Sequence, residues 1–88
     1  MYEYQKERPR LFSEEGIKMY AKMNYNIQRL CKQAGACTIE RAMVGVSGDS
    51  WMMLAVVDFL AERGEVRIIK DPCRAMQHNI IVLNIATA

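Results

Sequence analysis

Apolar and polar residues follow a helical period over the first long segment of the 88-residue chain. Between residues 13 and 34, apolar side chains recur every three or four positions, which predicts an amphipathic helix. Ser13 is suited to cap its first turn and Gly35 to end it. Residues 1–11, by contrast, are polar and have no strong period, which is typical of a flexible arm or an edge segment. The apolar face of the helix is expected to contain Ile17, Tyr20, Ala21, Ile27, Leu30, Cys31 and Ala34, widened by Met19 and Met23.

Two shorter helices are predicted next. Residues 36–38 are suited to a very short strand, and Thr38 to capping a helix over residues 39–44. Glycines at positions 45 and 48 interrupt the pattern and predict a tight turn. The next helix is expected to run to residue 63, with Ser47 or Asp49 as its cap and Gly64 as its end.

The C-terminal part changes to short runs rich in β-branched residues, at positions 65–70 and 79–85. This pattern predicts two strands joined by a loop of eight residues. The run 80–83 is apolar on both faces of such a strand. Either the ribbon is covered on both sides, or its outer face is an association edge.

The last predicted helix is expected to have one acidic, solvated face and one apolar, buried face. The solvated face consists of Trp51, Ala55, Asp58 and Glu62, and the buried face of Met53, Leu54, Val56, Val57, Leu60 and Ala61.

The segment from residue 38 to residue 69 resembles the winged helix-turn-helix family. It reads TIERAMVGVSGDSWMMLAVVDFLAERGEVRII, and its closing L-x-x-x-G-x-V pattern falls on Leu60, Gly64 and Val66. The resemblance implies a small α+β winged-helix-like domain over residues 12–88, preceded by an N-terminal arm over residues 1–11. That domain would have three helices and a C-terminal two-stranded wing.

In that family the last helix usually enters the DNA major groove, with its first residues facing base edges. By position, the resemblance implies base-facing roles for Ser47, Asp49, Ser50, Trp51, Met52 and Ala55. The chain departs from the family's pattern here, since residues 45–62 contain no Arg, Lys, Asn or Gln for bidentate base readout. Each carboxylate of this helix facing a phosphate would also cost about 1 kcal/mol.

Exposed cations offer a second route to nucleic acid. Lys18, Lys22, Arg29 and Lys32 fall within about 80° on the first long helix, with Tyr25 in the same arc. Such a stripe is either an ordinary solvated face or a surface for phosphates or an acidic partner. The full candidate set for double-stranded DNA is Lys18, Lys22, Arg29, Lys32, Ser50, Trp51, and Arg67, Lys70 and Arg74 of the wing.

The aromatic residues of the last helix have two main interpretations, and stacking of a nucleotide on Trp51 is a further alternative. Trp51 and Phe59 are either partly buried under the N-terminal arm or the wing, or they form an exposed surface together with Met52. Aromatic residues and Met are enriched at interface cores, so the second reading points to another protein or a second copy. The candidate interface is Trp51, Met52, Ala55 and Phe59.

Composition narrows the class of protein. The chain is 51% apolar and carries a net charge of +2, which fits one folded domain rather than a disordered segment. No apolar run approaches the ~20 residues that cross a bilayer, and the N-terminus lacks a signal-peptide core. We therefore expect a small soluble cytoplasmic protein with no membrane partner.

Catalysis and metal binding find little support in the sequence. Cys31, Cys37, Cys73 and the single His78 match no common zinc module, and reduced thiols are expected. No phosphate loop or nucleophile elbow is present, so no cofactor, metal or enzymatic activity is expected. Two functions remain open: a DNA-binding transcription regulator, and a non-catalytic protein-interaction or homodimerisation module on a winged-helix frame that uses the acidic, aromatic third helix.

Overall fold

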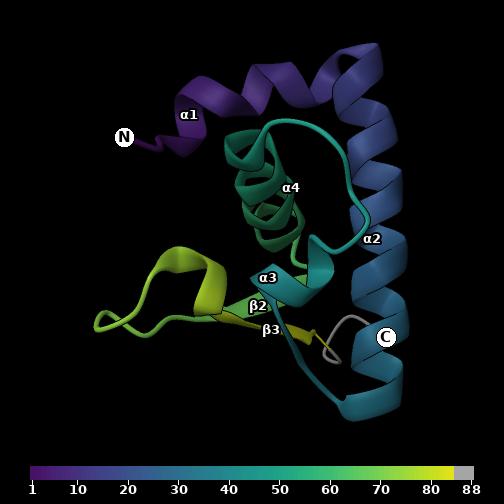
Figure 1. Ribbon diagram of the computed structural model, residues 1–88, viewed down its shortest axis with the longest axis vertical. Coiled ribbons are helices and arrows are strands. Elements are labelled where there is room, and N and C mark those ends of the chain that lie inside the picture. Colours follow the sequence, from purple (N-terminus) through teal and green to yellow (C-terminus); the bar gives the residue numbers. More distant parts are fainter. Residues whose placement is uncertain (85–88) are drawn as a thin grey trace.

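The longest helix, α2 (Glu14–Ala34), begins and ends where the sequence pattern predicts. Ser13 Oγ accepts a hydrogen bond from the Gly16 N–H at 3.1 Å, and Gly35 closes the helix with a φ of 84°. The computed structural model describes residues 1–84, and α2 runs along one side of it (Figure 1). Among those residues, no helix combines the length and the apolar character needed to cross a lipid bilayer.

The buried face of α2 agrees with the predicted one at Met19, Met23, Ile27 and Cys31 and differs from it at three other positions. Ile17 is 58% exposed, and Ala21 and Ala34 also lie on the surface. At 100° per residue, Ile17 and Ala21 lie about 140° around the helix from the row centred on Met23, which is the row that packs inward. The buried residues are Gly16, Met19, Met23, Asn26, Ile27 and Cys31.

The middle of the chain forms the predicted short strand and two helices. They are β1 (Cys37–Thr38), α3 (Ile39–Ala42) and α4 (Ser50–Glu62). Thr38 caps α3 by accepting from the Arg41 N–H at 3.1 Å. Of the two proposed caps for α4, Asp49 is the one used, since its side chain accepts from the Trp51 N–H at 2.8 Å.

The sheet has three antiparallel strands in the order β1-β3-β2, which corrects the expectation of a two-stranded wing. Strands β2 (Val66–Ile69) and β3 (Ile80–Leu83) pair with Ile68 opposite Ile81, and β1 pairs with the other edge of β3. The β2–β3 loop (residues 70–79) contains the short 3-10 helix η2 (Met76–His78). The predicted second strand extended to residue 85, which lies outside the described residues.

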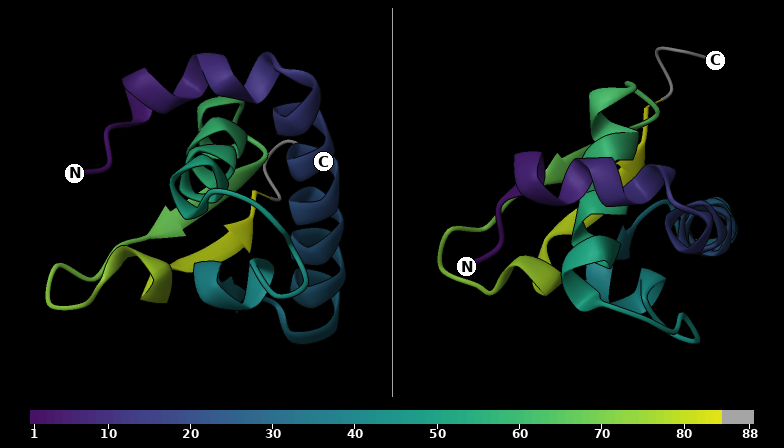
Figure 2. Two further views of the ribbon diagram at one scale, coloured as in Figure 1. Left: turned by 45° about the horizontal axis from the view of Figure 1, so that its top comes forward. Right: turned by 90° about the horizontal axis from the view of Figure 1, so that it is seen from above.

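The N-terminal segment (residues 2–12) is helical from residue 4 onward, so the prediction of a flexible arm or an edge is wrong. It forms α1 (Tyr4–Glu7) and a 3-10 helix, η1 (Arg8–Phe12), and adds helices to the three that were predicted. Leu11 is 4% exposed and joins the core. Figure 2 shows the segment crossing α4, and its contacts with that distant helix are what order it.

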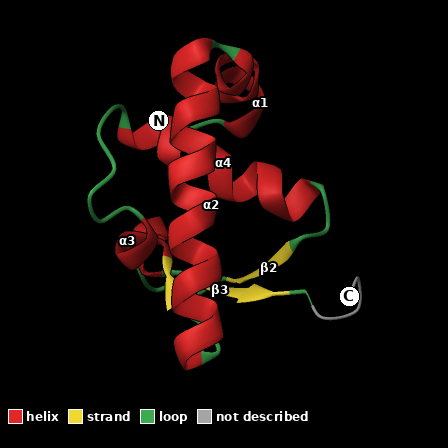
Figure 3. Ribbon diagram, turned by 90° about the vertical axis from the view of Figure 1, so that its right-hand side faces the viewer, coloured by secondary structure: helices red, strands yellow, loops and turns green. Residues whose placement is uncertain are grey.

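The core lies between α2, α4 and the inner face of the sheet. Figure 3 shows α4 above the sheet, with α2 running past both so that its last turns lie below the strands. Met23, Ile27, Leu60 and Ile81 are fully buried there.

Candidate nucleic-acid interface

The acidic face of α4 is covered by the N-terminal segment. The Tyr2 hydroxyl donates to Asp58 Oδ2 at 2.6 Å, and the Tyr4 hydroxyl donates to Glu62 Oε1 at 2.7 Å. Arg8 forms a two-pronged contact with the same Glu62 carboxylate, at 3.0 Å and 2.7 Å. Both carboxylates that were expected to face water bind this segment; Asp58 is half-buried, whereas Glu62 keeps 41% of its side-chain surface exposed.

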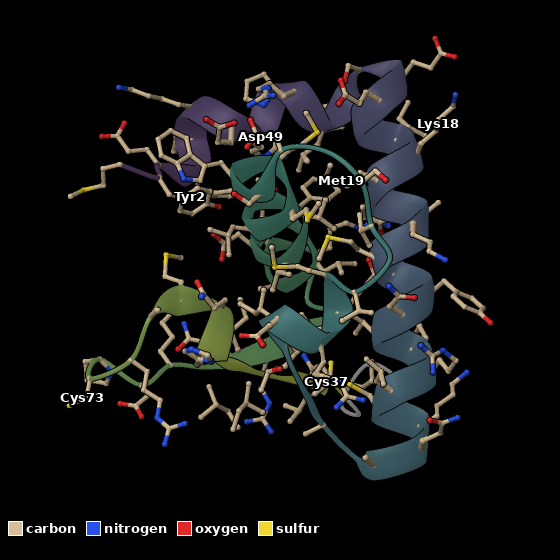
Figure 4. The ribbon with its side chains drawn as sticks, viewed as in Figure 1. Tyr2, Lys18, Met19, Cys37, Asp49 and Cys73 are labelled. Carbon is tan, nitrogen blue, oxygen red and sulfur yellow. The ribbon has the colours of Figure 1, made fainter. Side chains whose placement is uncertain are left out.

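The first turn of α4 is held in the same way. Arg10 Nη1 donates to Asp49 Oδ2 at 2.9 Å and also contacts Glu7. Asp49 thus caps the helix and anchors the N-terminal segment, and Figure 4 shows it at the end of α4 that lies beside that segment.

These contacts shift the pKa values of the paired groups. Hydrogen bonds from Arg8 and Tyr4 lower the pKa of Glu62 to about 2. Burial, followed by the hydrogen bond to Glu62, raises the pKa of Tyr4 to about 12. Burial and the bond to Asp58 also raise the pKa of Tyr2. Each shift favours the state in which the phenol is protonated and the carboxylate is charged.

Several residues predicted to face DNA bases or a partner are buried. Met52 is 1% exposed and Ala55 is fully buried, so neither is available to a ligand in this structure. The predicted solvated face of α4 is wrong at Ala55, and the proposed interface is wrong at Met52 and Ala55, because the helix is apolar nearly all round, which is typical of a core helix. Ser47 and Ser50 are exposed, and Trp51 keeps 42% of its surface.

Phe59 is half-buried in an aromatic cluster with the N-terminal segment and α2. Its ring lies edge-on to Phe12 at 5.7 Å and to Tyr20 at 5.9 Å between centroids. The Arg8 guanidinium lies 5.3 Å from the centroid of Phe59. The proposed interface residues therefore do not form one exposed surface. Among them, Trp51 is the residue whose side chain stays substantially exposed.

The cations of α2 lie on its solvent face. Lys18, Lys22, Arg29 and Lys32, here called the basic stripe, are all exposed, and Tyr25 between them is 62% exposed. Figure 4 shows Lys18 pointing away from the molecule and Met19 pointing toward α4. The Lys22 ammonium lies 5.9 Å from the Tyr25 ring centroid.

Most cations of the basic stripe have no acidic partner within the described residues. Lys18 lies 3.8 Å from Glu14 in the first turn, and no acidic residue occurs between residues 16 and 39. Most carboxylates elsewhere in the described residues are paired within the molecule. The cations with no carboxylate partner there are Lys22, Arg29, Lys32, Arg41, Arg67 and Lys70.

The structure does not bring the two predicted basic groups together. Arg67 and Lys70 are exposed on β2 and just after it, whereas Arg74 in the loop pairs with Asp71 at 3.3 Å. Figure 1 places the β2–β3 loop on the opposite side of the molecule from α2, and the views of Figure 2 agree. The stripe and the loop are therefore two separate surfaces.

The sulfur and imidazole groups do not form a metal centre in the part of the chain that the structure describes. No group of three or more His, Cys, Asp or Glu side chains is placed there to hold an ion. His78 lies 3.6 Å from Glu40 and links η2 to α3, while Cys73 is exposed in the β2–β3 loop. Cys31 and Cys37 lie close to each other, with 3.9 Å between their sulfur atoms.

The packing of the N-terminal segment over α4 was not predicted from the sequence. A signal was present, since Tyr and Arg residues in the N-terminal segment complement the acids of α4 in charge and hydrogen bonding. Nothing local connects groups that are more than fifty positions apart, so the pairing could not be assigned.

Comparison of the chain with models of protein families, with curated proteins and with solved structures finds no match.

Proposed function

We propose that this chain binds double-stranded DNA through phosphate contacts from the basic stripe, as a small regulator built on a winged-helix frame. The observation that carries the proposal is the exposed row of cations on α2, most of them without a carboxylate partner. Lys and Arg on one helix face provide the sequence-independent part of DNA affinity.

The topology supports the winged-helix frame. A short strand lies between the first two helices of the predicted domain, α2 and α3, and a hairpin follows the third, α4. The short strand pairs with the second strand of that hairpin, which gives the order β1-β3-β2. Helices on one side and a hairpin with a long loop are the parts that the sequence resemblance implies.

The contacts favour backbone binding over base readout. In this structure α4 cannot present its acidic face to a groove, because Tyr2, Tyr4 and Arg8 occupy that face. The stripe runs over fifteen residues of helix, from Lys18 to Lys32, and is about 21 Å long, which is long enough to follow several phosphates. We therefore expect affinity that falls steeply with salt and depends little on sequence.

The experiment compares two variants that remove the same charge from opposite sides of the molecule. In the first, Lys22, Arg29 and Lys32 are each changed to Gln, and in the second, Arg67, Lys70 and Arg74 are. Binding to mixed-sequence duplexes is measured against salt. The first variant is expected to weaken binding and reduce the slope of log K against log salt by about 3, since each phosphate contact contributes about 0.9.

The control variant is expected to keep most of the wild-type slope. Equal losses in both variants would show that net charge matters and the stripe does not. Undetectable binding of the wild-type protein at about 50 mM salt would reject the DNA proposal itself.

A second candidate function, homodimerisation, is favoured by the outer face of the sheet. Ile69 and Ile80 are partners across the β2–β3 pair and are 51% and 39% exposed. Exposed apolar neighbours on a sheet are typical of an association surface, and the occupant we propose is a second copy of the chain. Light scattering should then show a mass that rises with protein concentration. A constant monomer mass would exclude homodimerisation.

A further inference from the structure

Two thiols meet where α2 passes into β1. Cys31 lies near the end of α2 and is 5% exposed, and Cys37 lies in β1 and is half-buried. Gly35, with a φ of 84°, turns the chain so that these positions face each other. Their sulfur atoms are 3.9 Å apart, which is close to van der Waals contact.

The pair is open to small molecules on one side. Cys37 lines a cavity of about 250 Å³ between the end of α2, β1 and α3, with Arg41 at its wall. Cys31 lies behind it, within 3.6 Å of the Ile81 carbonyl oxygen. One thiol is therefore reachable from solvent, and the other is shielded but adjacent.

We propose that Cys31 and Cys37 form a redox site that closes into an intramolecular disulfide by exchange with a small-molecule disulfide such as glutathione disulfide. The Cys37 thiolate attacks one sulfur of the oxidant, forms a mixed disulfide and releases one glutathione thiolate. The Cys31 thiolate then attacks Sγ of Cys37 and displaces the second glutathione. The two cysteines lose two electrons and two protons, and the oxidant is reduced to two thiols.

The geometry favours the second step. A disulfide bond is about 2.05 Å long, so the sulfur atoms must approach by about 2 Å, a distance that side-chain rotation can supply. Because the second thiol is already in contact, ring closure needs no collision with another molecule. The mixed disulfide is therefore expected to be short-lived.

The rate of the first step is set by the Cys37 thiolate. Burial and the neighbouring Cys31 raise the pKa of Cys37 to about 12, so only a small fraction is ionised at neutral pH. The nucleophile in exchange is the thiolate. The oxidation rate should therefore rise about tenfold for each pH unit between about 7 and 10.

The test uses the full chain with Cys73→Ser, which removes the exposed third thiol. This variant is incubated with excess glutathione disulfide, and its mass and peptide map are followed over time. The expected product has lost two hydrogen masses and links Cys31 to Cys37. In the matched control, Cys37→Ser combined with Cys73→Ser, neither that loss nor the linked peptide should form.

Three other outcomes would overturn the proposal. A stable glutathione adduct on Cys37 without ring closure would show that the sulfur atoms do not approach. Thiols that remain reduced at pH 9 under strong excess of oxidant would show that the pair is inert. Oxidation of the wild-type protein that yields Cys73-linked dimers alone would place its redox chemistry in the β2–β3 loop.

Discussion

Asn26 is a buried polar side chain, 4% exposed, on the face of α2 that packs inward. Its Nδ2 donates to the carbonyl oxygens of Ala42 at 2.9 Å and Val44 at 3.2 Å. These carbonyls belong to the end of α3 and the turn after it, where no further helical turn satisfies them. One side chain thus joins α2 to the turn that leads into α4.

Asn26→Ala is expected to destabilise the fold by about 1–3 kcal/mol, because two carbonyl oxygens lose their donor. Urea unfolding followed by circular dichroism measures the change. The matched control is Asn24→Ala on the same helix, where the side-chain oxygen has no hydrogen-bond partner. A control loss as large as that of Asn26→Ala would contradict the assigned role.

Gly16 lies in the first turn of α2, directly against the backbone of η1. A Cβ added there would lie 2.6 Å from Leu11 Cα, a separation that requires the backbone to move. Ala is favoured over Gly in helices by about 1 kcal/mol, but a clash with packed backbone outweighs that gain. Gly16→Ala should therefore lower stability by about 1–2 kcal/mol in chemical denaturation, whereas Ile17→Ala, on the exposed side, should change it little. A stabilised Gly16→Ala would show that η1 does not pack as described.

The N-terminal segment depends on pH through its hydrogen bonds to α4. Glu62 has a lowered pKa, so its stabilising contribution is complete above its ordinary value of 4.5 and is lost as pH falls toward about 2. Tyr4 has a raised pKa, so its contribution is complete below 10.0 and is lost as pH rises toward about 12. The segment should loosen at both extremes.

We expect Tyr4→Phe to be less stable than wild type at pH 7 and to show a smaller alkaline loss between pH 10 and 12. Glu62→Gln should likewise reduce the acid loss between pH 4.5 and 2. Thermal unfolding across this pH range measures both. If the two variants follow the wild-type profile, the contacts with α4 do not set its pH dependence.

Local signals made α2, α3, α4 and the hairpin predictable, because the caps, glycines and apolar periods that define them lie within each segment. Ser13, Thr38 and Asp49 all act as the caps that their positions suggest. The orientation of α4 was not predictable in the same way. A helix that is apolar nearly all round has no unique solvent face, and its neighbours come from the other end of the sequence.

The candidate surfaces were predictable only in part for the same reason. The basic stripe follows from spacing on one helix, and all four of its cations are exposed. Met52 and Ala55 were assigned to a surface from helical position alone, but they lie in the core. The order of the sheet likewise depends on long-range pairing, since β1 pairs with β3 more than forty residues further along the chain.

At the level of the whole molecule, the basic stripe and the outer face of the sheet belong to different surfaces. The stripe lies on the solvent side of α2, and the inner face of the sheet is what α2 and α4 cover. DNA binding and self-association should therefore be separable by mutation.

Ile69→Thr combined with Ile80→Thr should abolish any rise of mass with concentration and leave the salt slope of DNA binding unchanged, because no charge is altered. Changing Lys22, Arg29 and Lys32 to Gln should reduce that slope by about 3 and leave the mass profile unchanged. Light scattering and fluorescence anisotropy on the same protein samples measure the two properties. If either variant alters both, the two surfaces are coupled: dimerisation would then have to supply part of the DNA contact, as it does where two copies share one site.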